Sequence, residues 1–268
     1  EEEIKNLRKR VDDLEENLYQ VNILIGIYRN PEDLHFNLEK GVFRVDNSEY
    51  TLVRSSTFDR YVEEIKQRIA SGELIVLTGP KGVGKSVLAR YTLAVMLSSD
   101  PYIVYEVSGL EASQIAGHIG KLHLLADTLF EKQLKRLILY YDPSKPEHYR
   151  ALRRVPELKS SDIATIISEL VEFNKDRASK DRKTPVVIVL SSDILEDVLQ
   201  RVGGYSEFIR ERVIHVDLRQ EEFLADIVKA YSEGKCNDDS VYERLGREIA
   251  KRYQGGYTLV ARYAGEWL

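Results

Sequence analysis

Short apolar runs alternate with amphipathic stretches through the middle of the chain. The runs are rich in Val, Ile, Leu and Tyr. Between them, apolar residues recur every three to four positions, which is typical of helices. Short buried strands that alternate with helices favour a parallel sheet covered on both faces. We therefore expect an α/β fold with five parallel strands, at 74–78, 102–107, 137–141, 186–190 and 212–218.

The pattern changes on either side of this core, which we place at residues 56–218. Residues 219–268 carry only helical periodicity and predict a small helical lid. Residues 22–55 form a connecting segment in which GVFRV and YTLVR are strand-like. The turn residues Asp46-Asn47-Ser48 lie between these runs, so the segment is compatible with a β-hairpin.

The first 21 residues have a narrower apolar stripe. Apolar side chains alternate in steps of three and four among strongly charged neighbours, at Ile4, Leu7, Val11, Leu14, Leu18 and Val21. This spacing is that of a coiled-coil seam. An amphipathic helix docked on its own domain is the alternative, but the narrow stripe favours self-association. We expect residues 1–21 to be a coiled-coil helix that supports a homo-oligomer.

Composition narrows the class of protein further. A single cysteine, Cys236, excludes an internal disulfide. No apolar run approaches the about 18 residues that a membrane-spanning helix needs, and no signal segment is visible, so we expect a cytoplasmic protein without membrane insertion. The net charge of -5 gives no bulk basic surface for nucleic acid. Charged residues and tyrosines are abundant whereas Cys and Met occur once each, which is typical of thermophilic proteins.

A glycine-rich stretch, GPKGVGKS, follows the first strand of the core and fits the pattern GxxxxGK[ST] at every position. Its glycines let backbone N–H groups point at phosphate oxygens, and the helix that follows adds its positive end. Lys85 is expected to reach the β and γ phosphates, and Ser86 to offer a hydroxyl to Mg²⁺. The expected nucleotide-binding residues of this loop are Gly79, Pro80, Lys81, Gly82, Val83, Gly84, Lys85, Ser86 and Val87.

A carboxylate for Mg²⁺ is expected at the end of a neighbouring strand. Asp142 is the first acid after the apolar run LILYY, and we assign it the metal role over that of a turn residue before Pro143. An ATPase normally has a glutamate in the position of Pro143, where it activates the attacking water. Three interpretations stay open: Asp142 activates the water, Glu106 or Glu147 reaches in instead, or hydrolysis is slow.

Three further polar residues are expected near the end of a bound triphosphate. VVIVLSSD brings Ser191 and Ser192 to the end of the fourth strand, facing the γ-phosphate. Arg262, in the last helical stretch, could reach the phosphates from the lid. The alternative for Arg262 is a solvated helix residue.

Two arginines, Arg210 and Arg212, come directly before the fifth strand. An arginine in this place can neutralise transition-state charge at the nucleotide of a neighbouring subunit. Surface ion pairs with Glu207 or Glu211 are the alternative.

The whole arrangement from about residue 51 to 268 resembles the AAA+ ATPases, most closely the archaeal branch near the STAND and origin-recognition-like ATPases. The resemblance rests on TGPKGVGKSVLARY, LILYYD, VVIVLSS, FIRERVIHVDLRQEEFL and YQGGYTLVARYA. In that family these motifs are Walker A, Walker B, sensor 1, an arginine finger before the last strand, and sensor 2. The resemblance implies ATP and Mg²⁺ as cofactors and catalytic roles for Lys85, Asp142, Ser192, Arg210 and Arg212.

Three functions remain in consideration. The first is an oligomeric ATPase that remodels a protein or nucleic-acid partner. The second is a slow-turnover, nucleotide-dependent switch or loader that acts on DNA, with basic clusters at Arg150-Arg153-Arg154 and 175–183 as possible phosphate contacts. The third is a small-molecule kinase, which is disfavoured because no arginine-rich substrate lid is evident.

Overall fold

The computed structural model describes most of the chain after its first 25 residues. The described residues are 26–45, 48–99, 102–107, 112–131, 135–143, 158–232, 236, 238–253 and 257–267. The predicted coiled coil at 1–21 lies outside them, as do Glu147 and the basic cluster at 150–154. Among the described residues, no helix is both long enough and apolar enough to cross a membrane.

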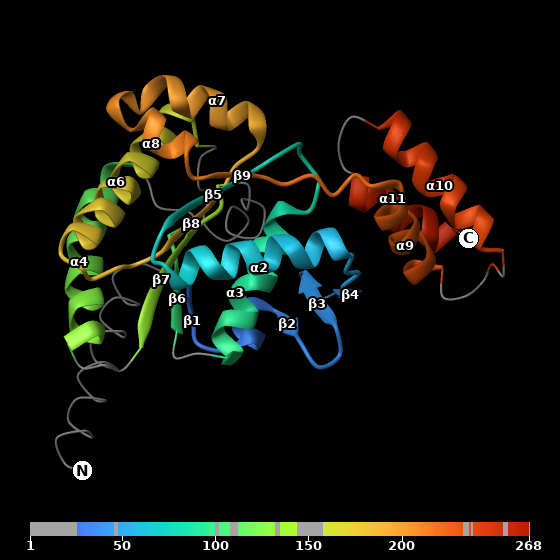
Figure 1. Ribbon diagram of the computed structural model, residues 1–268, viewed down its shortest axis with the longest axis horizontal. Coiled ribbons are helices and arrows are strands. Elements are labelled where there is room, and N and C mark those ends of the chain that lie inside the picture. Colours follow the sequence, from blue (N-terminus) through green and yellow to red (C-terminus); the bar gives the residue numbers. More distant parts are fainter. Residues whose placement is uncertain are drawn as a thin grey trace, which may run out of the picture.

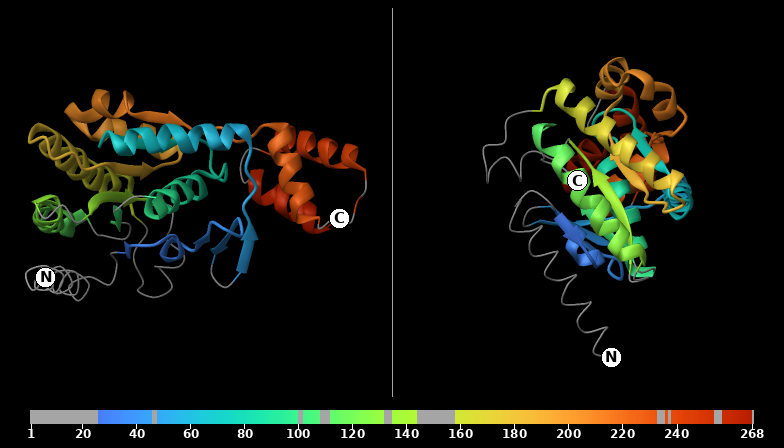
Figure 2. Two further views of the ribbon diagram at one scale, coloured as in Figure 1. Left: turned by 60° about the horizontal axis from the view of Figure 1, so that its bottom comes forward. Right: turned by 90° about the vertical axis from the view of Figure 1, so that its left-hand side faces the viewer.

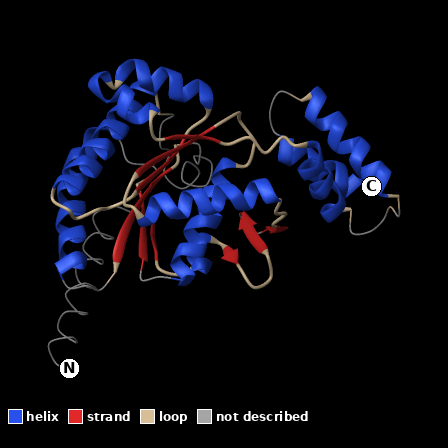
Figure 3. Ribbon diagram, in the orientation of Figure 1, coloured by secondary structure: helices blue, strands red, loops and turns tan. Residues whose placement is uncertain are grey.

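A six-stranded sheet forms the centre of the molecule (Figure 1, Figure 3). The strand order is β1-β6-β7-β8-β5-β9. The strands are β1 (Gly26–Tyr28), β5 (Leu74–Thr78), β6 (Tyr102–Glu106), β7 (Arg136–Tyr141), β8 (Val186–Val189) and β9 (Val213–His215). All neighbours are parallel except β1, which pairs antiparallel with β6.

The predicted count of five strands was therefore wrong by one. The five parallel strands are present, and β1 adds an antiparallel edge. β1 is only three residues long, GIY, and has no alternating pattern to distinguish it. It is a strand because it pairs with β6, about 78 residues further along the chain, and local sequence carries no signal for such a partner.

Strict alternation along the strands divides the core into two halves. Ile75 and Leu77 face α2 (Ser56–Ala70) and α3 (Lys85–Ser99). Leu74 and Val76 face the opposite layer. That layer consists of α4 (Ala112–Glu131), α6 (Ser160–Ser179) and α7 (Ser192–Arg201). Figure 2 shows the two helical layers on opposite sides of the sheet, so the expected helices on both faces are confirmed.

Three helices complete the chain at one end of the molecule (Figure 1). They are α9 (Glu221–Tyr231), α10 (Asp239–Arg252) and α11 (Tyr257–Trp267). α9 packs against both of the others. A Cβ atom on Gly246 of α10 would lie 2.4 Å from the carbonyl oxygen of Glu221, so only glycine permits this close approach.

A second, small sheet lies between α3 and the C-terminal helices. Its strands are β2 (Phe36–Asn37), β3 (Val42–Val45) and β4 (Ser48–Thr51), all antiparallel. A short 3-10 helix, Pro31–Leu34, precedes it. Phe36 stacks on Phe43 at 5.6 Å and meets Tyr91 of α3 edge-on at 5.8 Å. These aromatic contacts fasten the small sheet to the core.

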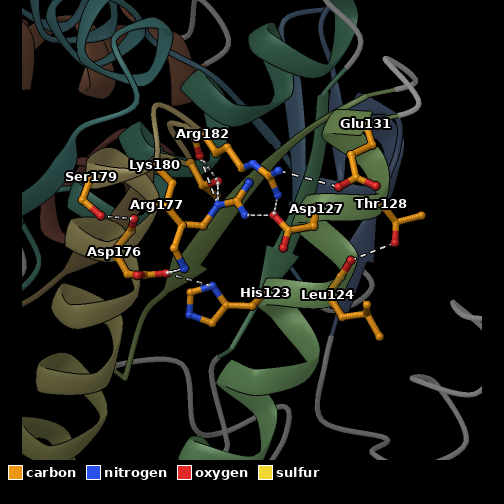
Figure 4. Close-up of polar contacts among 11 residues, drawn as sticks. His123, Leu124, Asp127, Thr128, Glu131, Asp176, Arg177, Ser179, Lys180 and Arg182 are labelled. Carbon is orange, nitrogen blue, oxygen red and sulfur yellow. Dashed lines mark hydrogen bonds and ion pairs between the residues drawn. The ribbon is translucent and has the colours of Figure 1, made fainter.

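A partly buried ion network joins the carboxyl-terminal ends of α4 and α6 (Figure 4). Asp127 accepts hydrogen bonds from Arg177 and, at 2.7 Å, from Arg182. The Arg177 side chain is 2 % exposed, and its Nε also donates to the Arg182 carbonyl and the Thr184 hydroxyl, each at 3.1 Å. Removing Asp127 would leave a buried guanidinium without its counter-charge.

We expect Asp127→Ala to lower the free energy of unfolding by about 1–3 kcal/mol, because it leaves the buried Arg177 guanidinium without its charged acceptor. Asp176→Ala is the matched control, since Asp176 pairs with the exposed Lys180 on the same helix surface, and it should cost less than about 1 kcal/mol. Urea unfolding followed by circular dichroism measures both. Equal losses would contradict the assignment.

Candidate nucleotide-binding site

The loop between β5 and α3 is the first component of the site. α3 begins at Lys85, so the glycine-rich stretch lies at its amino-terminal end. The Lys85 ammonium donates hydrogen bonds to the carbonyl oxygens of Gly79 (2.9 Å) and Pro80 (2.8 Å). The residue is only 7 % exposed. The loop thus encloses the ammonium group that is expected to contact the phosphates.

Glycine is required at position 79 because the chain that follows β9 passes close to its backbone. The amide of Val216 donates to the carbonyl oxygen of Thr78 at 2.7 Å, which holds the chain after β9 against the start of the loop. A Cβ atom on Gly79 would lie 2.3 Å from the Val216 carbonyl oxygen. A side chain here would push the loop away from the sheet. Of the other loop residues, Val83 is buried, Ser86 is partly buried and Lys81 is exposed.

Two carboxylates lie within electrostatic reach of the Lys85 ammonium. Burial lowers the pKa of Lys85, and the negative charges of Asp142 and Asp193 oppose this effect. The structure therefore brings together Lys85 and Asp142, which are 57 positions apart in the sequence. This is possible because β7 and β5 are parallel and separated only by β8, so their carboxyl ends share one edge of the sheet.

Asp142 lies at that edge, directly after β7, and is fully buried. The hydroxyl of Tyr140 donates to its Oδ2 at 3.1 Å. Burial, reinforced by the charge of Asp142, raises the pKa of Tyr140 well above its ordinary value, so the phenol stays a donor. The carboxylate is thus held by a side chain from its own strand.

The donors available suit magnesium. Ser86 in the first turn of α3 offers a hydroxyl, and Asp142 offers a carboxylate. Among the described residues, no group of three or more His, Cys, Asp or Glu could hold a metal ion by itself. Mg²⁺ is commonly bound by one or two protein ligands together with phosphate oxygens and water, so these two residues would hold it only together with a nucleotide.

The end of β8 contributes a residue that the sequence reasoning missed. The amide of Ser192 donates to the Gly79 carbonyl at 3.2 Å, so α7 begins beside the loop. The carboxylate of Asp193 accepts from Ser191, which lowers its pKa; backbone amides and Lys85 act in the same direction, against burial. Asp193 therefore stays ionised near the lysine. The signal was present as SSD after a buried strand, but only the serines were considered.

The two arginines before β9 differ in their environment. They lie in and after α8 (Ser206–Arg210), which follows a short 3-10 turn at Gly203–Tyr205. Arg212 donates to the Phe208 carbonyl at 2.9 Å and to Glu211 at 3.1 Å, and it stacks 3.6 Å from the Phe208 ring. The Arg210 side chain is 60 % exposed, and its nearest acidic partner, Glu196, is at the long distance of 4.0 Å. The ion pair considered for Arg212 is thus present, whereas Arg210 presents its guanidinium to solvent.

An apolar pocket of about 290 Å³ opens beside the loop. It is bounded by the small sheet, α2, the loop, α9 and α11, through Phe43, Tyr50, Thr51, Leu52, Val53, Phe58, Gly84, Val87, Leu218, Phe223, Ile227, Tyr231, Thr258 and Arg262. Its wall is mostly aliphatic and aromatic, as in pockets that take a flat organic ring. Because its lining includes Gly84 and Val87, the pocket adjoins the glycine-rich loop.

Arg262 lies at the wall of this pocket. Its side chain is only 19 % exposed, so it is not the solvated helix residue that was the alternative expectation. The guanidinium lies 4.7 Å from the centre of the Tyr50 ring, and its Nε is 3.1 Å from Glu266. On the same helix, the hydroxyl of Thr258 donates to the Gly82 carbonyl at 3.1 Å. The C-terminal helices therefore contact the phosphate loop directly.

Glu106, one of the residues considered for activating water, lies deeper in the fold. It is fully buried at the end of β6 and accepts a hydrogen bond from Tyr28 of β1. It belongs to a polar cluster beneath α3, away from the pocket. Asp142 and Asp193, in contrast, both act electrostatically on Lys85.

Together, the strand, the glycine loop with its lysine, and the carboxylate across the sheet define a P-loop NTPase fold. The structure of Cdc6p supports this fold. Cdc6p from Pyrobaculum aerophilum superposes with a TM-score of 0.54 at 15 % identity, covering 80 % of this chain and 63 % of that one. The Aeropyrum pernix ORC2 protein in its ADP form gives 0.49 and 16 %, covering 80 % and 61 %. At this identity the likeness to Cdc6p supports the fold alone.

Comparison of the sequence with known proteins does not identify a family. No family model matches the chain. A guanylate kinase from Rubrobacter xylanophilus is 28 % identical over 186 residues, which cover 66 % of this chain and 91 % of that protein. The chain spans less than two thirds of the length of the two archaeal proteins that it resembles in structure.

We expect Gly79→Ala to lower the free energy of unfolding by about 1–3 kcal/mol, since the loop must move off the Val216 carbonyl. Gly117→Ala is the control: it lies within α4 with open space around it, so it should stabilise the protein by about 0.5–1 kcal/mol through helix propensity. Denaturant titration of both variants tests this. A neutral Gly79→Ala would contradict the packing described.

Proposed function

We propose that the chain binds Mg-ATP at this site and hydrolyses it to drive the remodelling of a protein or nucleic-acid partner, as a cytoplasmic homo-oligomer. The observation that carries the proposal is the convergence of Lys85 and Asp142 beside an apolar pocket that the C-terminal helices help to close. Lys85 and Asp142 would serve the phosphates and the metal ion, and the pocket, which includes Gly84 and Val87 of the loop in its lining, would take the base.

The roles of the residues follow from their positions. Lys85 would exchange the carbonyl oxygens of Gly79 and Pro80 for phosphate oxygens, which are stronger acceptors for an ammonium. Backbone amides of the loop and the start of α3 would surround the same phosphates. Asp142 and Ser86 would hold Mg²⁺, which neutralises charge on the transferred phosphoryl group.

Arg262 and the pocket would act on the rest of the nucleotide. The apolar walls favour an adenine ring, which offers a large flat surface with few polar atoms. Arg262 would lie between the base pocket and the phosphates. Through its hydrogen bond to Gly82, Thr258 would transmit movements of the loop to the C-terminal helices. Nucleotide occupancy would thereby be coupled to these helices, which is the requirement for work on a partner.

A neighbouring subunit would supply the remaining cation. Arg210 is exposed at the surface, whereas Arg212 is tied to Phe208 and Glu211. We therefore assign the finger role to Arg210. The predicted coiled coil at 1–21 supports assembly but lies outside the described residues.

Two alternatives have specific support. Pro143 after Asp142 favours a slow-turnover switch or loader that acts on DNA. The segment 175–183, however, is a poor DNA contact, because Arg177 and Arg182 are engaged with Asp127. The identity to guanylate kinases favours a small-molecule kinase. Turnover measured with and without DNA separates the first alternative from the main proposal, since brisk DNA-independent turnover counts against a switch.

Isothermal titration calorimetry should detect binding of ATP with Mg²⁺, and Lys85→Ala should weaken it by about 10- to 100-fold, because a charge-assisted hydrogen bond contributes about 1.5–3 kcal/mol. Lys81→Ala, which removes an exposed lysine of the same loop, should have a much smaller effect. Tight binding of GMP, with phosphoryl transfer to it, would favour the kinase instead. Failure of the folded protein to bind any nucleotide would refute the proposal.

Arg210→Ala is expected to lower kcat for ATP hydrolysis by at least about 100-fold while leaving ATP affinity nearly unchanged, since a finger acts on the transition state. Arg212→Ala is the control and should have a weaker effect on kcat. Mixing Arg210→Ala with Lys85→Ala subunits should restore part of the turnover, because each supplies what the other lacks. No recovery in mixed assemblies would argue against action between subunits.

A further inference from the structure

A second polar cluster lies beneath α3, behind the phosphate loop. We call it the Tyr140 cluster, and it consists of Tyr28, Arg90, Glu106 and Tyr140. Tyr28 is 8 % exposed, and Glu106 and Tyr140 are fully buried. Most buried polar groups in a core have hydrogen-bond partners. No residue of the cluster except Glu106 was singled out from the sequence.

The contacts within the cluster run from the sheet edge to the candidate metal ligand. Tyr28 of β1 donates to Glu106 of β6. Glu106 is the register partner of Tyr140 on β7, so the two side chains are neighbours on one face. Tyr140 in turn donates to Asp142 at 3.1 Å. Three adjacent strands thus contribute a row of buried polar side chains that ends at Asp142.

Arg90 connects this row to the phosphate-loop helix. Burial lowers the pKa of Arg90, but Tyr140, Glu106 and Tyr28 outweigh it, so its net shift is upward. Arg90 follows Ser86 by four positions, which places both on the same face of α3. The cluster therefore spans the helix that carries Ser86 and the strand that carries Asp142.

We propose that Tyr140 is a positioning residue for the magnesium site: its hydroxyl fixes the orientation of the Asp142 carboxylate, and Arg90, Glu106 and Tyr28 hold Tyr140 in place. This inference rests on the proposed function of the site. A carboxylate is only loosely restrained about its terminal torsion. A ligand carboxylate is therefore commonly held by a hydrogen bond from a second residue, whose loss costs about 10- to 100-fold in metal affinity.

The adjacent tyrosine provides a matched control. Tyr141 is as deeply buried as Tyr140 but points to the opposite face of the sheet. Within the part of the chain that the structure describes, its hydroxyl has no hydrogen-bond partner. Tyr140→Phe and Tyr141→Phe therefore delete the same atom from neighbouring positions of one strand, and only the first deletion touches Asp142.

The test measures the affinity for a fluorescent ATP analogue twice for each variant, once in EDTA and once in saturating Mg²⁺. The ratio of the two dissociation constants reports what the metal contributes. We expect Tyr140→Phe to lower this ratio by about tenfold relative to the wild-type chain, with the affinity in EDTA unchanged. Tyr141→Phe should keep the wild-type ratio. General damage to the fold would weaken binding under both conditions and leave the ratio unaltered.

A wild-type ratio in Tyr140→Phe, or an equal fall in Tyr141→Phe, would overturn the inference while leaving the proposed function intact. If the wild-type chain binds no nucleotide under either condition, the proposed function fails and the inference fails with it. Should Tyr140→Phe not fold, Tyr28→Phe probes the cluster from its other end. It is expected to lower the same ratio to a smaller extent, and an unchanged ratio there would likewise overturn the inference.

Discussion

The ammonium of Lys85, enclosed by the Gly79 and Pro80 carbonyls and faced by Asp142 and Asp193, is the interaction on which the rest of the site depends. A buried positive charge is costly unless acceptors and counter-charges surround it. The loop supplies the acceptors from one strand end, and the two acids come from two others. A site of this kind therefore requires three strand ends in register, which is what the parallel sheet provides.

The same constraint extends outward through polar contacts. Asp142 is held by Tyr140, and Tyr140 belongs to a cluster that reaches the edge strand β1. In the other direction, Thr258 joins the loop to α11, and Arg262 lies against Tyr50 of the small sheet. Segments near both ends of the described chain are thus linked to the site. This arrangement is suited to a protein in which a bound nucleotide changes the position of distant helices.

The arginines away from the loop divide into those held in ion pairs within the fold and those whose guanidinium faces solvent. Arg177 and Arg182 share Asp127, and this network ties α4 to α6 far from the loop (Figure 4). They carry charge without offering it to a ligand. Arg210, by contrast, has only a 4.0 Å contact with Glu196 and is mostly exposed. Sequence alone gives these arginines equal weight, because burial and partners are decided by packing.

The sequence by itself determined the α/β class, the five parallel strands and the phosphate loop. These features follow from local patterns: short β-branched runs form buried strands, and GPKGVGKS permits only a few backbone paths. The tertiary structure decided the sixth strand β1, the proximity of Asp193 to Lys85, the contrast between Arg210 and Arg212, and the cluster behind Asp142. Each of these depends on which residues from distant segments meet across the sheet. Such pairings depend on the order of the strands in the sheet and on which face of the sheet each side chain points to. A local sequence pattern contains neither piece of information.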